Sequence, residues 1–187
     1  GLLDSKNRIW WGSSKSLTML DMNNFHCPVE PPTLQLNRIE INEQYADYRH
    51  LTDNARKEMN FNGVAKFYNY PFPLELPHNN NHLTFHFSAI DWYAPHSIMY
   101  SYKMEGLNDP WSLPSSEAKA DYRSMPYGSY TFKIRAIGGA QIWSEPFEYT
   151  FTINPPWWHT LGARVGYVIA FLLLLLGLGR WRTAKLK

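Results

Sequence analysis

The sequence predicts an all-β protein, an antiparallel β-sandwich followed by one C-terminal transmembrane helix. Three observations support this fold class: short segments in which apolar and polar residues alternate, a composition with 16% aromatic residues and 13 prolines, and an uncharged apolar run near the C-terminus. Aromatic residues are enriched in strands, and prolines lie at strand edges or in turns. The 187 residues suffice for one hydrophobic core, and the single cysteine, Cys27, excludes an internal disulfide.

The first strand of the expected sandwich contains an irregularity. Its apolar residues form two pairs that differ in phase: Leu34 with Leu36, and Ile39 with Ile41. Because side chains alternate between the two faces of a strand, both pairs face one core only if an extra residue lies between them. We therefore expect a β-bulge near Asn37 and Arg38, or a strand that changes sheet there.

Four later segments alternate regularly and predict strands with one buried face. They are residues 82–90, 98–105, 129–136 and 146–154. Residues 74–76, which lie among prolines, predict a short edge strand. The pattern in residues 43–69 is weaker; Asp53 is a candidate N-cap for a helical turn or two over residues 53–59.

Short strands separated by turns over about 120 residues, without long helical patterns, predict an immunoglobulin/fibronectin-like sandwich. The expected organisation along the chain is a partial repeat at 1–25, a linker at 26–32, the sandwich at 33–154, a Pro/Trp junction at 155–160, a transmembrane helix at 161–181 and a cytoplasmic basic tail at 182–187.

The transmembrane prediction rests on residues 165–179, an uncharged run that includes five consecutive leucines. As a helix this run spans about 22 Å, so the span must extend outward to Trp157 and Trp158 and inward to Trp181, which places aromatic rings at both interfaces. The basic residues after the run place the C-terminus in the cytoplasm and the body outside it, anchored by a single pass in the inner membrane. A buried core helix is the alternative interpretation.

The charge distribution argues against nucleic-acid binding. The formal net charge is +2, but the residues beyond 160 include five basic side chains and no acid. The first 160 residues are therefore acidic overall, with 13 basic against 16 acidic residues. Such a body lacks the basic surface that a phosphate backbone requires.

Three motifs in order resemble the triple-tyrosine (Y_Y_Y) domain of hybrid two-component sensor kinases: a tyrosine-rich strand followed by a Gly and a Trp, a Tyr before a Pro/Gly turn and strand, and a Pro-Pro-Trp sequence before the membrane helix. The matching residues are Tyr100, Tyr102, Gly106, Trp111, Tyr122, Pro126, Gly128, Tyr130, Pro155, Pro156 and Trp157. Two departures occur: Met104 stands where Leu is usual, and Tyr127 separates Pro126 from Gly128.

Residues 1–25 resemble one repeat of the two-component regulator propeller that precedes this domain in the family. Roughly 25 residues cannot form a propeller alone, so we expect the chain to be a fragment of a longer sensor. The resemblance implies a homodimer, kinase domains on the cytoplasmic side, and an oligosaccharide as the ligand of a propeller outside this chain.

The motif residues also have structural interpretations that need no chemistry. We expect the tyrosines and Trp111 to pack in the core, with Trp111 covering one open end of the sandwich. Tyr130 follows a Pro126-Tyr-Gly128 turn at the start of a strand, the position of a tyrosine corner. Pro155 and Pro156 predict a stiff link that couples the last strand to the helix.

No pattern for catalysis, a cofactor or a metal is evident, so we predict a non-enzyme. His82 and His86 are expected on the solvated face of a strand, which does not favour a metal site with His78. The alternative function is a membrane-anchored carbohydrate-binding or adhesion module, which requires Asp91, Trp92 and Trp111 to be exposed on one face. Such a module would use its aromatic rings and carboxylate to bind a sugar.

Overall fold

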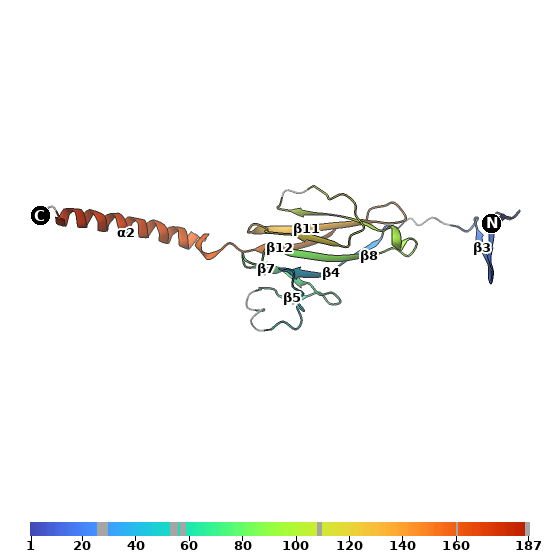
Figure 1. The fold of residues 1–187 in the computed structure, drawn as a ribbon, viewed down its shortest axis with the longest axis horizontal. Helices are drawn as coiled ribbons and strands as arrows, with labels where there is room; N and C mark the ends of the chain where they lie inside the picture. The colour runs from blue at the N-terminus through green and yellow to red at the C-terminus, as the bar shows by residue number, and fades with distance from the viewer. Residues whose placement is uncertain (26–29, 53–55, 57–58, 108–109, 160, 186–187) are drawn as a thin grey trace.

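The computed structural model describes residues 1–25, 30–52, 56, 59–107, 110–159 and 161–185 (Figure 1). A small N-terminal sheet, a β-sandwich and a C-terminal helix follow one another along the long axis of the molecule. The first sheet consists of β1 (Leu2–Leu3), β2 (Arg8–Ser13) and β3 (Ser16–Asp21). The predicted linker residues 26–29 and the helical turn predicted at 53–59, except residues 56 and 59, lie outside the described residues.

Two sheets form the sandwich. The three-stranded sheet has the order β10-β8-β4, with strands Lys119–Tyr122, Leu83–Ile90 and Thr33–Ile41. The four-stranded sheet has the order β7-β12-β11-β9, with strands Leu74–Leu76, Phe147–Ile153, Gly128–Ile137 and Met99–Glu105. Between β4 and β7 the chain adds the small pair β5 (Gly63–Val64) and β6 (Pro71–Phe72).

The predicted antiparallel arrangement is correct for these sheets except at one described edge. β7 lies at the edge of its sheet, as predicted, but runs parallel to β12, with Leu74 opposite Phe151 and Leu76 opposite Ile153. Parallel pairing is possible because more than 60 residues separate the two strands along the chain, which leaves ample length for a crossover.

The predicted bulge is present in β4. Leu36 pairs with Phe87 and Arg38 pairs with His86, so Asn37 is the extra residue. Because of this insertion both Leu36 and Ile39 are fully buried.

The core forms where the alternating apolar faces of the two sheets meet. The Phe85 and Phe132 rings stack across the interface with their centroids 4.2 Å apart. The predicted inward residues of β8, β9, β11 and β12 are buried or pack against the core; they include Leu83, Phe87, Tyr100, Met104, Ile134, Tyr149, Phe151 and Ile153. The amino-acid pattern therefore predicted these four strands and their orientation correctly.

Strand β10 was not predicted. Its four residues carry only one fully inward side chain, Ala120, and the methyl group of alanine gives little hydrophobic signal. The strand is defined by its neighbour, because Lys119 to Tyr122 pair in antiparallel register with His86 to Leu83.

The C-terminal segment is helical, as predicted, in α2 (Leu161–Lys185). Among the residues that the structure describes, no helix was found to be long and apolar enough to cross a membrane. The transmembrane span remains a prediction from the sequence.

The predicted tyrosine corner is present at the start of β11. The Tyr130 hydroxyl donates a hydrogen bond to the Pro126 carbonyl at 2.7 Å, and Tyr130 is 4% exposed. Burial raises the pKa of this hydroxyl. Gly106 packs against the same residue: its φ is +99°, and a Cβ there would approach the Ser129 carbonyl oxygen to 2.8 Å. The corner thus fixes the turn before β11 and requires glycine at position 106.

Replacing Tyr130 with Phe should lower the free energy of unfolding by about 1–3 kcal/mol, because the Pro126 carbonyl loses its donor while the ring packing is kept. Urea unfolding of the 187-residue chain measures this change. Tyr93→Phe, at an exposed tyrosine, is the control and should leave the free energy unchanged. Equal stability of the Tyr130→Phe variant and the wild type would exclude a stabilising corner.

Candidate functional site

The junction between the sandwich and the helix is the candidate functional site. β12 ends at Ile153, which is buried, and the Asn154 N–H donates to the Leu76 carbonyl at 2.7 Å, so pairing with β7 continues to the last residue before the prolines. Pro155 and Pro156 then connect to a 3₁₀ turn, η2 (Trp157–His159), and α2 begins at Leu161. The predicted junction residues therefore lie between the last core strand and the helix.

The junction has an open side. A cavity of about 310 Å³ lies beside it, lined by Asn60, Glu75, Pro77, His78, Asn154, Pro155, Pro156 and Trp157. Pro156 is buried, whereas Trp157 is 73% exposed. The segment is thus held at a few points rather than packed on all sides.

The predicted tyrosines lie in and around the core. Tyr100 is buried, and its hydroxyl accepts a hydrogen bond from the Ala89 N–H of β8 at 3.1 Å. Tyr102 and Tyr122 are partly buried and form an edge-to-face pair, with centroids 6.2 Å apart. Both rings also lie 6.2 Å from Phe132. These tyrosines connect the two sheets and are not exposed as a binding surface.

The prediction that Trp111 covers an open end of the sandwich is wrong. Its ring lies on the outer face of the four-stranded sheet, 4.2 Å from the Arg135 guanidinium carbon and 5.3 Å from the Lys103 ammonium. Trp143, which the sequence reasoning did not select, lies 4.3 Å from the same guanidinium carbon. Arg135 is therefore sandwiched between two tryptophans, a cation–π arrangement that attracts Trp111 to the sheet face.

Each of these two tryptophans is followed by a serine that forms hydrogen bonds with the backbone of a strand. The Ser112 N–H donates to the Tyr102 carbonyl at 2.8 Å, and the Ser112 hydroxyl accepts from the Tyr102 N–H at 3.0 Å. Ser144 makes the same pair of bonds with Ala136, at 2.8 and 3.0 Å. The repeated Trp-Ser dipeptide was the available sequence signal for this arrangement.

The conditions for a carbohydrate platform at Asp91 are not met. Asp91 is 8% exposed, and its carboxylate accepts hydrogen bonds from the N–H groups of Tyr93, Ala94 and Gly139 at 2.7–3.1 Å. The bonds from Gly139, Tyr93 and Ala94 lower the pKa of Asp91. Trp92 is 88% exposed, but the adjacent Asp91 carboxylate already accepts hydrogen bonds from two loops and thereby connects them.

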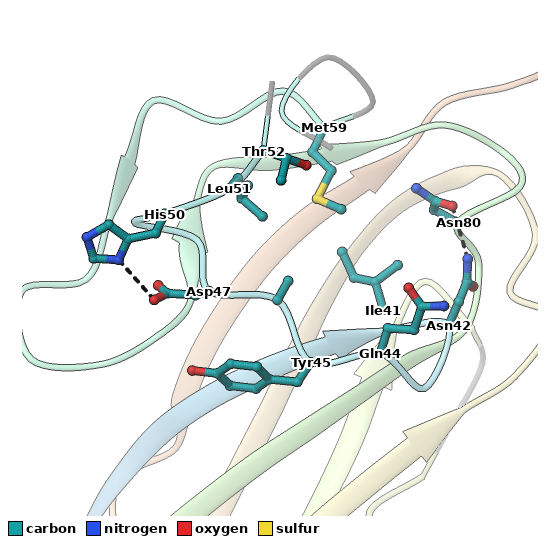
Figure 2. A pocket seen from close by; sticks show the side chains of 11 residues that line it. Ile41, Asn42, Gln44, Tyr45, Asp47, His50, Leu51, Thr52, Met59 and Asn80 are labelled. Carbon is teal, nitrogen blue, oxygen red and sulfur yellow. Dashed lines mark hydrogen bonds and ion pairs between the residues drawn. The ribbon is translucent and has the colours of Figure 1, made fainter. Parts of the chain in front are cut away.

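A second cavity, of about 370 Å³, lies in the excursion between β4 and β8 (Figure 2). Figure 2 shows amide side chains on one side and an Asp47–His50 pair on the other, with their atoms 3.0 Å apart. Asn42 donates to Asn80 at 3.0 Å, so the amides also bond to each other. The lining consists of Ile41, Asn42, Gln44, Tyr45, Ala46, Asp47, His50, Leu51, Thr52, Met59 and Asn80.

The outer face of the three-stranded sheet carries ion pairs. His82 and His86 lie there, as predicted, beside carboxylates: His82 Nε2 lies 2.5 Å from Asp121, and His86 Nε2 lies 3.1 Å from Glu40. Burial opposes ionisation of Asp121, but hydrogen bonds from His82, Arg123 and Thr84 outweigh it and lower its pKa to about 2. Within the described part of the chain, no group of three potential ligands is placed to hold a metal ion.

Residues 93–154 match the Y_Y_Y domain. The resemblance inferred from the motifs is therefore confirmed for this segment, which contains β9 to β12. The Y_Y_Y match begins after β8, so the predicted boundary at residue 33 stays a prediction, although β4 and β8 complete the sandwich.

One curated protein and two solved extracellular domains are similar to this chain. It is 25% identical over 115 residues to histidine kinase P4 of Formosa agariphila; the match covers 61% of the chain and 8% of that kinase. The extracellular domains of two B. thetaiotaomicron proteins share the fold. BT3049, assigned to the hybrid two-component systems, gives a TM-score of 0.54 at 20% identity, over 82% of this chain and 19% of its own. The extracellular domain of BT4673 is described as part of a one-component system with one structure and of a hybrid two-component system with another. It gives a TM-score of 0.53 at 21% identity, over 83% of this chain and 20% of its own.

The chain thus spans less than a tenth of the curated relative and about a fifth of each solved chain. These comparisons show a Y_Y_Y segment at residues 93–154 and a fold shared with two solved extracellular domains.

The lowered pKa of Asp121 leads to a prediction for acid stability. Because the folded-state pKa is about 2 and the ordinary value is 3.8, the ionised Asp121 stabilises the fold above about pH 4, and this contribution is lost as the pH falls toward 2. Asp121→Asn should therefore reduce stability at pH 6 and flatten the acid limb between pH 4 and 2. Urea unfolding at several pH values measures both effects. Glu145→Gln, at an exposed position, should retain the wild-type acid limb; an unchanged limb in Asp121→Asn would contradict this role.

Proposed function

We propose that this chain is a non-catalytic, membrane-proximal and extracytoplasmic module of a bacterial two-component sensor, and that it couples an upstream propeller to a transmembrane helix. The observation that carries the proposal is the direct continuation of the last core strand, through a paired Asn154 and two prolines, into α2. A Y_Y_Y domain in that position, with kinase and sensor relatives, supports a role in signal transmission.

The exposed apolar side chains of α2 support its placement in a membrane. Its apolar side chains over residues 165–174 are each more than half exposed around the helix: Val165, Tyr167, Val168, Ile169, Phe171, Leu172, Leu173 and Leu174. A helix that is apolar on every side requires an apolar environment on every side. In the sequence, the apolar run continues to Gly179 and is followed by basic residues, which favours a cytoplasmic C-terminus.

The N-terminal sheet supports an upstream propeller. β1, β2 and β3 form an antiparallel sheet in which Leu2, Leu3 and Leu17 are more than 60% exposed. A propeller blade has about four strands and covers its faces with neighbouring blades, so such exposed apolar residues suit part of a blade. The ligand of this propeller would be an oligosaccharide, an expectation that derives from the family resemblance.

The proposed partners are the membrane and a second copy of the chain. A single helix transmits a rotation or a displacement only relative to a reference, which a second helix provides in a homodimer. Ligand binding would bias how two sandwiches pair, and the junction at Pro155, Pro156 and Trp157 would transfer that bias to the helices. No nucleic acid, cofactor or reaction enters this mechanism.

The topology is tested with reporter fusions. A reporter that is active only outside the cytoplasm should be active when fused before Trp157 and inactive when fused after Lys187, because the basic cluster stays on the cytoplasmic side. A cytoplasmic reporter should give the opposite pattern. Activity of the extracytoplasmic reporter at Lys187 would contradict the proposed orientation.

The coupling is tested at the prolines. Replacing Pro155 and Pro156 with Gly in the full-length sensor should abolish most of the signalling response. A flexible junction would make the orientation of the helix independent of how the sandwiches are arranged. Ligand affinity at the propeller should change by no more than the ~1–3 kcal/mol of typical allosteric linkage. The control, Pro95→Gly, lies in the 3₁₀ turn η1 (Pro95–Ser97), just before β9 and at the end of the sheet opposite Ile153. A full response from the Gly-Gly variant would exclude the stiff junction.

A further inference from the structure

The junction is held by more than its prolines. Asn154 ends the pairing with β7, and the His159 N–H donates to the Pro156 carbonyl at 2.9 Å, which closes the 3₁₀ turn η2. Two aromatic side chains of the sandwich contact this turn from different loops. Neither residue belongs to the Y_Y_Y motif positions identified in the sequence.

The first contact comes from the loop after β7. The His78 and Trp158 rings meet edge to face, with their centroids 5.2 Å apart and their planes at 78°. His78 lies two residues beyond Leu76, whose carbonyl accepts the hydrogen bond from Asn154. The same short segment therefore contacts the chain before and after the two prolines.

The second contact comes from the turn before β11. The Tyr127 and His159 rings lie 5.8 Å apart, with their planes at 42°. Tyr127 directly follows Pro126, the residue whose carbonyl accepts the hydrogen bond of the tyrosine corner. The buried Tyr130 hydroxyl therefore fixes the backbone position from which Tyr127 reaches the junction.

We propose that His78 and Tyr127 are positioning residues that hold the start of α2 in a defined orientation relative to the sandwich. Two contacts are needed because a single contact leaves the turn free to rotate about it, whereas contacts from two loops fix that rotation. The cavity of about 310 Å³ beside the prolines leaves the junction unpacked on one side, so the ring contacts carry much of this restraint. The proposal rests on the proposed function as a coupling module.

Spin-label distances test this proposal without a ligand. The 187-residue chain, with Cys27→Ser, receives labels at Thr150→Cys on the outer face of β12 and Val168→Cys on α2, both exposed positions. Pulsed electron paramagnetic resonance in phosphatidylcholine nanodiscs then gives the distribution of distances between the sandwich and the helix. The same measurement is made on the chain carrying His78→Ala and Tyr127→Ala.

We expect the double variant to give a distribution about twofold broader than the wild type, because the link becomes flexible at both contact points. The matched control is Tyr93→Ala with His96→Ala, which removes an exposed tyrosine and an exposed histidine at the opposite end of the sandwich and should leave the width unchanged. His78→Phe with Tyr127→Phe keeps both rings and should restore the narrow distribution. All variants should remain folded at the temperature of measurement, because all four positions are exposed and lie outside the core.

A wild-type width in the alanine variant would overturn the proposal, and so would equal broadening in the control. If the alanine variant does not fold, His78→Gln with Tyr127→Leu provides the same test. The experiment also separates this inference from the proposed function. Failure of α2 to insert into nanodiscs would contradict the membrane module, while the distance distribution in detergent micelles would still report on the two ring contacts.

Discussion

Packing of aromatic rings between the two sheets is the interaction on which the rest of the structure depends. The Phe85 and Phe132 rings stack with their centroids 4.2 Å apart. The rings of Phe87, Tyr102 and Tyr122 surround this pair, each with its centroid 6.2–6.3 Å from Phe85 or Phe132. With no internal disulfide, the sandwich must be held by such burial, and aromatic pairs add about 0.5–1.5 kcal/mol each beyond the area they bury. The ring packing fixes β8 against β11, and β11 in turn fixes β12 by pairing from Gly128 to Ile134. The exit point of the chain toward α2 is therefore determined by the core.

The parts of the fold that follow from alternation could be predicted from the sequence, because alternation is a local consequence of one buried face. The bulge at Asn37 was predictable for the same reason, since Leu36 and Ile39 can face one core only with an inserted residue. The tyrosine corner was predictable because its donor and acceptor, Tyr130 and Pro126, are four residues apart. Each of these features depends on residues that are close in the chain.

The features that sequence reasoning missed depend on distant residues. Strand β10 exists because β8 offers an unpaired edge, and the parallel direction of β7 is set by its pairing with β12, more than 70 residues later. Trp111 was expected at an end of the sandwich, but Arg135 attracts its ring to the outer face of the sheet. At the candidate site, the prolines were identified from the Pro-Pro-Trp motif before the helix. His78 and Tyr127 required the three-dimensional structure, because neither residue type nor local spacing links them to Trp158 and His159.

The strength of the junction contacts is compatible with the coupling role that we propose. Two exposed ring contacts of about 0.5–1.5 kcal/mol each stabilise one orientation of η2 by an amount similar to the ~1–3 kcal/mol of typical allosteric coupling. If core packing fixed the junction, reorienting the helix would cost more free energy than such a coupling can supply, and the helix would stay in one orientation. A junction without contacts would populate many orientations, and no arrangement of the sandwiches would be transmitted. The corner at Tyr130, which is buried, and the contact at Tyr127, which is exposed, thus place a rigid support directly beside a weak contact, and this is the combination that a coupling element requires.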